Sequence, residues 1–323
     1  MTDLTLIPTL PVVAGPLSRH PAAVYLASLG AGSRRTMHQA LDAIAGLMTG
    51  GQADALALPW ERMRYEHAVA IRAALSERYA AATANKMLSA LRGVLKTAWH
   101  LGLMTAEDCQ RARSVRNVGG SVLPAGRALT AGEIEALLNV CANDPTPAGA
   151  RDGALIAVLR AGGLRRAEVC TLALADYNPA DDSLTVRGKR NKQRIVYLIG
   201  GAVEALSDWL AYRGSGPGPL FCPVAKGGRV ITGQGVTSQA VYNALAKRAR
   251  ESGVKELSPH DLRRTFVGDL LDLGADIATV QRLAGHENIQ TTARYDRRGE
   301  EAKRRAVAML HVPWRRPRMA GIR

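Results

Sequence analysis

The chain of 323 residues is 47% hydrophobic but only 4% aromatic, and its formal net charge is +15 at pH 7. This length suits two domains, and cores built from Ala, Leu, Val and Ile favour helices. The cationic excess predicts a polyanionic partner, nucleic acid before membrane, although a generally basic soluble protein has the same charge. Four scattered cysteines without a C-x-x-C pair suggest neither a disulfide framework nor a zinc site, and without a long apolar run no membrane span is expected.

In chain order, residues 1–18 are predicted to form an extended N-terminal arm, and residues 19–114 have a helical pattern. Helix signals occur at "PAAVYLASLG", at "SRRTMHQALDAIAGLM", which starts with a serine cap, and at "PWERMRYEHAVAIRAALSERY", which starts with a proline. Another helix is predicted in "TANKMLSALRGVLKTAWHLGLM", where apolar residues recur at helical spacing. This block is therefore predicted to be a small domain of four or five helices.

Basic side chains recur on this helical block. Several precede or open helices, where backbone N–H groups also favour phosphate, although a solvated helix face accounts for many of them. The residues that we expect to contact DNA here are Arg34, Arg35, Lys86, Arg92 and Lys96.

Residues 115–128 interrupt the helical pattern with glycines, a proline and arginines, so they are predicted to link two domains. A basic linker suits a two-domain clamp that closes around a duplex. Flexible connectors, however, are often basic without such a role.

Residues 129–312 are predicted to form a second domain that is mainly helical. "TAGEIEALLNVC" indicates a capped helix, and two more helices are hinged at Gly162–Gly163. Apolar residues then alternate on either side of a polar turn, which predicts a β-hairpin: Leu184 and Val186, followed by Ile195, Tyr197 and Ile199. Helices resume at "TSQAVYNALAKRARESG". The predicted fold class is mainly α with a small β-hairpin or sheet.

The end of the chain carries two further features. "EEAKRRAVAMLHV" reads as an amphipathic helix, which could dock on a neighbouring protomer or pack on its own domain. Residues 313–323 form a basic tail that is predicted to be disordered.

The stretch "SPHDLRRTF" has the signals of a helix start, because Ser258 can cap it, Pro259 suits its first position and Asp261 lies three residues after the cap. The side chains of His260, Arg263 and Arg264 should then emerge together from the opening turns. A shared anion would explain this grouping. Helical geometry alone does not choose between Arg263 and Arg264.

Three other short pieces carry reactive or cationic residues: "GGLRRAEV", "RGKRNKQR" and "LAGHENIQTTARY". Each alone has an ordinary explanation, such as a surface charge, a solvated turn lysine or a packing tyrosine. Together and in this order, they resemble the tyrosine recombinase (phage integrase) family, and in particular its Xer-like members. The family pattern is Arg, a hairpin Lys, His-x-x-Arg, His or Trp, and then Tyr.

The resemblance covers essentially residues 129–312, and residues 19–114 are similar in size and place to the family's core-binding domain. It implies a catalytic set of Arg165, Lys189, His260, Arg263, His286 and Tyr295. It selects Arg165 over Arg166, Lys189 over Lys192 and Arg263 over Arg264. Two positions depart from the family pattern: Arg264 stands where a second His is frequent, and Tyr197 where Pro is frequent.

The chemistry of these residue types fits the resemblance. Two arginines can each fork onto the nonbridging oxygens of a phosphodiester, and His286 would hydrogen-bond one of them. A phenol with a pKa near 10 needs activation, for which His260 is the expected base, and Lys189 is the expected acid for the leaving 5′ oxygen. Glu168 and Asp176 are expected to orient the catalytic arginine without contacting the phosphate themselves. Further expected DNA contacts are Arg166, Arg190, Lys192 and Arg264.

The family implies a site-specific recombinase that cleaves and rejoins duplex DNA through a 3′-phosphotyrosine and a Holliday junction, with neither metal nor ATP. It also implies a tetramer on DNA, a monomer in solution, and a related recombinase or an accessory DNA-bending protein as further partners. The expected location is the bacterial cytoplasm, at the nucleoid. The rival functions are a type IB topoisomerase-like relaxation of DNA and a catalytically silent architectural DNA-binding protein.

Overall fold

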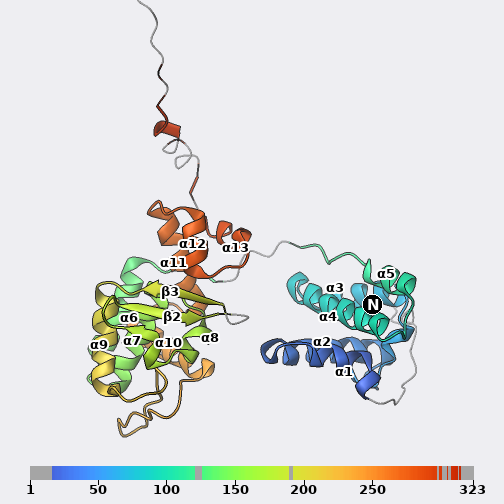
Figure 1. Cartoon of the computed structure of the whole chain (residues 1–323), viewed down its shortest axis with the longest axis horizontal. Helices are drawn as coiled ribbons and strands as arrows, with labels where there is room; N and C mark the ends of the chain where they lie inside the picture. The colour runs from blue at the N-terminus through green and yellow to red at the C-terminus, as the bar shows by residue number, and fades with distance from the viewer. Residues whose placement is uncertain are drawn as a thin grey trace, which may run out of the picture. The chain divides into compact units, whose positions relative to one another are not determined.

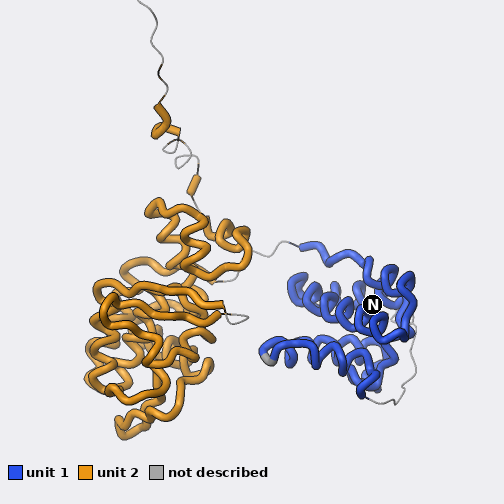
Figure 2. The backbone as a smooth tube through the Cα atoms, viewed as in Figure 1, with its two compact units in different colours: residues 1–124 blue, residues 125–323 orange. Residues whose placement is uncertain are grey.

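A computed structural model describes residues 17–120, 126–188, 192–296, 298–299, 304, 307–311 and 313 of the chain. The chain divides into two compact units, residues 1–124 and residues 125–323 (Figures 1 and 2). Nearly all of the expected N-terminal arm and basic tail, and most of the helix expected after Tyr295, lie outside the described residues. None of the helices in the described ranges is both long enough and apolar enough to cross a membrane.

The first unit is entirely helical in its described part. Its α-helices are α1 (Pro21–Ala27), α2 (Ala31–Thr49), α3 (Tyr65–Arg78), α4 (Ala81–His100) and α5 (Ala106–Arg113), with short 3₁₀ turns at Leu17–Arg19 and Trp60–Arg62. Five α-helices agree with the upper number expected from the sequence.

Helix α4 provides the apolar face around which the first unit packs. Its residues Leu88, Leu91 and Leu95 are each at most 1% exposed. The ring of Tyr25 from α1 lies so close to Gly93 that a Cβ there would stand 2.4 Å from the ring. Gly93 is thus required where α1 crosses α4.

Two helix starts differ from the sequence-based predictions. Helix α2 begins at Ala31 with Gly30 as its N-cap, so Ser33 lies inside the helix and does not cap it. The helix expected to start at Pro59 begins instead at Tyr65, as α3, because Pro59 precedes only the short 3₁₀ turn. Arg64 stabilises the break by donating from Nη1 to the carbonyls of Glu61 and Met63, each at 2.9 Å.

The predicted linker is fastened at both of its ends. Arg72 donates to the carbonyl of Arg116 at 2.9 Å, and Asn85 exchanges hydrogen bonds with the backbone of Val118 at 2.7 and 3.0 Å. In the second unit, the amide of Arg127 donates to Asp261 at 2.9 Å. The segment between the two attachments is therefore shorter than residues 115–128.

The second unit surrounds a small sheet with helices. Its α-helices are α6 (Ala131–Ala142), α7 (Pro147–Gly162), α8 (Arg166–Thr171), α9 (Gly201–Arg213), α10 (Ser238–Ser252), α11 (Pro259–Asp272), α12 (Ile277–Ala284) and α13 (Ile289–Ala293), and a 3₁₀ turn covers Leu174–Asp176. The strands are β1 (Tyr177–Asn178), β2 (Ser183–Arg187) and β3 (Gln193–Tyr197). They form an antiparallel sheet in the order β1-β2-β3.

The hairpin expected from alternating apolar residues is present, and its register settles which residues face the core. Leu184 and Val186 on β2 are fully buried. On the β3 side, however, Val196 and Leu198 are buried, whereas Ile195 is 53% exposed and Tyr197 is 56% exposed. Because both sets are apolar, the alternation predicts the strand but not its inward face.

Helix α7 is buried on nearly all sides and ends in the expected glycine hinge. Gly163 follows with φ +55°, and a Cβ there would stand 2.2 Å from the ring of Phe266 on α11. The chain can turn sharply here only because residue 163 has no side chain. This turn brings Arg165, at the start of α8, next to α11.

Candidate active site

The residues implied by the resemblance come from elements that are distant in sequence and adjacent in the second unit. Helix α8 packs on β2, α12 packs on β3 and on α11, and α13 follows α12 (Figure 1). A cavity of about 740 Å³ opens among them, and its lining includes Arg165, Lys192, Arg194 and His286.

Arg165 is held by its neighbours in a fixed direction. Its Nη1 donates to Glu168 at 2.6 Å, and its Nη2 donates to the carbonyl of Gly285 at 2.7 Å. Its backbone amide also donates to Glu168, at 2.8 Å. The side chain is still 41% exposed, so it is oriented by the protein and open to an anion. Glu168 thus contacts both the side chain and the backbone of Arg165.

Arg194 contacts the site through Glu168, and the sequence reasoning did not single it out. Nη1 and Nη2 grip both oxygens of Glu168, at 3.0 and 2.8 Å, and Nε donates to the carbonyl of Leu283 at 2.9 Å. Burial raises the pKa of Glu168, but the bonds from Arg194 and the Arg165 amide outweigh it and hold that pKa below its usual range. Arg194 is the last residue of "GKRNKQR", so its place after the hairpin lysines was the available signal.

Arg263 is a buried cation with a free donor. It is 3% exposed, and Nη1 donates to the carbonyl of Gly163 at 2.6 Å. Its Nη2 finds no hydrogen-bond partner among the described residues. Burial, followed by the charge of Arg165, lowers the pKa of Arg263 to about 10, so this guanidinium stays charged at neutral pH in a place that disfavours charge. An arriving anion would relieve both the missing bond and the repulsion.

His286 is placed by the turn after α12. It is 9% exposed, and its Nδ1 lies 2.8 Å from Oγ1 of the fully buried Thr292. Burial and the charges of Arg263 and Arg165 lower its pKa to about 4, so the ring is neutral at pH 7. If Thr292 donates its hydroxyl proton to Nδ1, the neutral ring carries its own proton on Nε2 and can donate it to a phosphate oxygen.

Tyr295 lies against the two histidines. Its hydroxyl is 3.1 Å from Nε2 of His260, and its ring stacks on His286 with centroids 6.1 Å apart. Partial burial and the charges of Arg263 and Arg264 lower the pKa of His260, which favours the neutral imidazole needed to accept a proton. The exposed position of His260 keeps this pair open to a ligand.

The remaining expected residues have different positions. Asp176 bonds to Arg187 at 3.0 Å and to the amide of Ala173 at 2.8 Å, so its hydrogen bonds are not with Arg165. Lys189 and Arg190 lie outside the described residues. Arg166 and Lys192 are exposed, and Lys192 lines the cavity.

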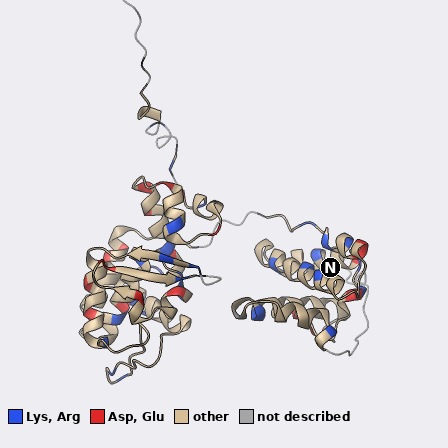
Figure 3. Ribbon diagram, viewed as in Figure 1, with Lys and Arg blue, Asp and Glu red and all other residues tan. Residues whose placement is uncertain are grey.

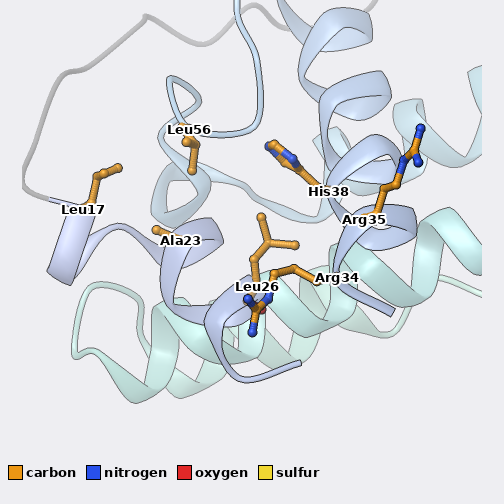
Figure 4. Close-up of a pocket in the computed structure, with 7 residues that line it drawn as sticks. All are labelled: Leu17, Ala23, Leu26, Arg34, Arg35, His38 and Leu56. Carbon is orange, nitrogen blue, oxygen red and sulfur yellow. The ribbon is translucent and has the colours of Figure 1, made fainter. Parts of the chain in front are cut away.

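The basic residues of the first unit fall into two groups. Arg34 turns back onto α1 and donates to the carbonyls of Leu26 and Leu29, whereas Arg35 points away from it (Figure 4). Arg92 donates to the carbonyl of Val115 at 2.6 Å, beyond the end of α5. Arg34 and Arg92 therefore stabilise the unit itself.

The other expected cations, Arg35, Lys86 and Lys96, are exposed. Lys and Arg are spread over the helices of the first unit and gather beside the β2–β3 hairpin of the second (Figure 3). Within the described ranges, no cluster of His, Cys, Asp and Glu is arranged to hold a metal ion.

A tyrosine in contact with a histidine, with the charges of Arg165 and Arg263 close by, forms a centre suited to nucleophilic attack on an anion. The chain belongs to the phage integrase family, whose sequence model matches residues 127–301. It is similar to the tyrosine recombinase XerC of Corynebacterium glutamicum, with 38% identity over 148 residues, which cover 45% of this chain and 46% of that protein. Over 244 residues, the tyrosine recombinase XerC of Roseiflexus sp. is 29% identical, covering 73% of this chain and 75% of the relative.

The chain spans about half the length of the first curated relatives that it matches, 46% and 47%. Among solved structures, the Tn1549 transposon integrase in complex with transposon right end DNA has a TM-score of 0.65 at 16% identity, covering 90% of this chain and 99% of the other. A lambda integrase dimer bound to a COC′ core site has a TM-score of 0.64 at 18% identity, covering 88% and 95%. These likenesses confirm the predicted fold class.

Proposed function

We propose that the chain is a site-specific DNA recombinase in which Tyr295 attacks a scissile phosphate and forms a 3′-phosphotyrosine. The observation that carries the proposal is the contact of the Tyr295 hydroxyl with Nε2 of His260, at 3.1 Å, beside the buried cation Arg263. Family membership and the XerC names of its relatives support it.

In the proposed reaction, Arg165 and Arg263 bind the nonbridging oxygens, on which negative charge grows as the phenol oxygen approaches phosphorus. Arginines held in place before the reaction stabilise this charge without reorganising, and loss of one such donor typically slows a reaction by ~10²–10³. The unpaired Nη2 of Arg263 is the donor that an oxygen would satisfy. His286 adds a hydrogen bond from its neutral ring.

Proton transfers complete the step. His260 accepts the phenol proton as the P–O bond to Tyr295 forms, and the bond to the 5′ oxygen breaks. The resemblance assigns the proton for that leaving oxygen to Lys189, and Lys192, which lines the cavity, is the alternative among the described residues. A 5′ hydroxyl from a second duplex then attacks the phosphotyrosine and releases Tyr295. The phosphotyrosine conserves the bond energy, so no nucleotide hydrolysis is needed.

The wider activity follows the same proposal. The first unit serves as a core-binding domain, with Arg35, Lys86 and Lys96 on phosphates. Four protomers assemble on two duplex sites, and strand exchange passes through a Holliday junction to integrate, excise or resolve DNA in the bacterial cytoplasm. The structural neighbours named above are integrases bound to DNA, and the relatives are bacterial.

A suicide-substrate assay tests the chemistry. Footprinting with the full chain on DNA that flanks its own gene locates a binding site. In the suicide substrate, a nick lies close to the scissile phosphate, so that the short fragment with the released 5′ hydroxyl diffuses away after cleavage. The native chain should leave a covalent protein–DNA adduct, and Tyr295→Phe should leave none. The absence of an adduct with native protein, or an adduct with Tyr295→Phe, contradicts the proposal.

Two further assays separate recombination from its rivals. Recombination predicts exchanged products from a plasmid with two sites, whereas a topoisomerase relaxes supercoils without exchange and an architectural protein binds without cleaving. A 5′-bridging phosphorothiolate, whose sulfur leaves without protonation, identifies the acid. It should rescue cleavage by Lys189→Ala but not by Arg165→Ala.

A further inference from the structure

Arg264 follows Arg263 on α11, and its side chain contacts other parts of the protein, which binding to DNA alone would not require. Its guanidinium carbon lies 5.5 Å from the centroid of the Tyr295 ring. Its Nη1 donates to the backbone carbonyl of Gly126 at 3.0 Å. One side chain therefore connects the proposed nucleophile to the segment that begins the second unit.

That segment is itself hydrogen-bonded to α11. The amide of Arg127 donates to Oδ1 of Asp261 at 2.9 Å, and the amide of Leu129 donates to Oγ1 of Thr265 at 2.9 Å. Oδ2 of the same Asp261 accepts the amide and the hydroxyl of Ser258, each at 2.8 Å. The helix cap and the segment thus share one carboxylate, which is 5% exposed.

Gly126 is required for this arrangement. Its φ is +91°, and a Cβ would stand 2.2 Å from Oδ1 of Asp261. Any side chain at position 126 must push the segment away from α11 and carry the carbonyl with it. The position of that carbonyl is therefore sensitive to a one-carbon change that removes no charge.

We infer that Arg264 is a positioning residue for the nucleophile, which holds the ring of Tyr295 while the carbonyl of Gly126 anchors it. This inference rests on the proposed function and gives Arg264 a different role from the DNA contact expected from the sequence. A cation over an aromatic face is attractive, and a planar guanidinium can stack and donate in its plane at the same time. The first residues of the second unit thus become part of the active site.

The inference predicts an effect on chemistry and not on binding. At saturating suicide substrate, Arg264→Ala should slow single-turnover cleavage by about 2- to 30-fold, the range expected for a lost cation–π contact. Arg264→Lys should recover part of that rate because it keeps a cation. Arg250→Ala, which removes an exposed arginine of α10, is the matched control and should cleave at the native rate. An unchanged saturating rate in Arg264→Ala, with only weaker binding, overturns the inference.

Gly126→Ala tests the anchor independently. It should slow cleavage, and the double variant with Arg264→Ala should be no slower than Arg264→Ala alone, because both changes break one connection. Gly228→Ala is the control for backbone strain, since Gly228 has φ +83° and a Cβ there would stand 3.9 Å from Cδ of Pro147, which is an ordinary contact distance. Additive effects of the two changes overturn the inference.

The pH profile gives a readout that a general loss of structure does not produce. The charged and titratable groups that act on His260 are Arg263, Arg264 and Asp261 from α11, Arg165 from the start of α8 and His286 from the turn after α12, with Tyr295 in contact. These cations lower the pKa of His260, and the acidic limb of the pH profile of cleavage follows the protonation of that ring. Arg264→Gln removes one cation, so the limb should move to higher pH. Arg264→Lys keeps the charge, so the limb should stay in place. A limb that does not move in Arg264→Gln contradicts the placement of the guanidinium.

The failures are distinguishable. If the native chain forms no adduct, the proposed function fails and takes this inference with it. If the native chain forms an adduct and Arg264→Ala cleaves at the native saturating rate, only the inference fails.

Discussion

Glu168 accepts hydrogen bonds from both Arg165 and Arg194, and replacing it with glutamine tests that arrangement. Glu168 is 5% exposed and accepts four hydrogen bonds, two from Arg165 and two from Arg194. Glu168→Gln keeps the shape of the side chain but removes its charge and turns an NH₂ group toward donors. Arg194, 12% exposed, then loses its counter-charge.

The magnitude follows from the burial of these charges. Removing one partner from a buried ion pair typically costs about 3–5 kcal/mol. A domain of 150–250 residues loses roughly 2–4 °C of Tm for each kcal/mol, so the expected fall is roughly 6–20 °C. The second unit falls in that size range. Cleavage should also slow, because Arg165 loses the contact that orients it.

Thermal unfolding followed by circular dichroism measures the first effect, and single-turnover cleavage the second. Glu107→Gln is a matched control, since Glu107 pairs with Arg111 at the surface with side chains 71% and 68% exposed. Exposed pairs contribute about 0–1 kcal/mol, so its Tm should hardly change. A Glu168→Gln variant with native Tm and native cleavage rate refutes the reasoning.

The same comparison has a pH signature. The folded pKa of Glu168 is depressed below its ordinary value of 4.5, so the stability that its charge contributes is fully present above pH 4.5 and is lost as pH falls through the folded pKa. The difference in stability between the native chain and Glu168→Gln should therefore be constant near pH 7 and shrink on acidification below 4.5. A difference that grows on acidification contradicts the assignment.

Four further outcomes are expected. Arg165→Ala should abolish cleavage and leave most duplex affinity, measured by adduct formation and by titration with labelled duplex, because other cations remain; a collapse of binding would make Arg165 merely structural. Arg92→Ala should lower the stability of the chain by about 1–3 kcal/mol in thermal unfolding through its lost carbonyl bonds. Lys96→Ala should instead weaken salt-dependent DNA binding at unchanged Tm, and the reverse pattern would contradict both roles. Gly285→Ala should lower Tm by roughly 2–8 °C, because residue 285 has φ +66° and its Cβ would stand 3.0 Å from Nη1 of Arg194; a native Tm would show that the turn does not require glycine.

Local chemistry explains what the sequence predicted well. The start of α11 follows from Ser258, Pro259 and Asp261, which stabilise a helix end through contacts three residues apart. The capping box of Thr130 and Glu133 at α6 is local in the same way. Such signals lie within one turn, so the sequence contains all the information they need.

Long-range contacts explain what it did not predict. The sequence shows Arg194 after the hairpin lysines and Arg92 on a helix, but only the fold directs them at Glu168 and at the carbonyl of Val115. The order of motifs selected Arg263 over Arg264, but the separate contacts of Arg264 depend on Gly126, more than a hundred residues away along the chain. Folding, and not local pattern, gives these cations their distinct partners.

The most direct test of the account is to identify the amino acid that carries the DNA. Protease digestion of the trapped adduct, followed by nuclease treatment and mass spectrometry of the nucleotide-bearing peptide, locates the bond. The account predicts a phosphotyrosine at Tyr295, with the nucleotide attached through its 3′ phosphate. A nucleotide on any other residue, or attachment through a 5′ phosphate, would contradict it.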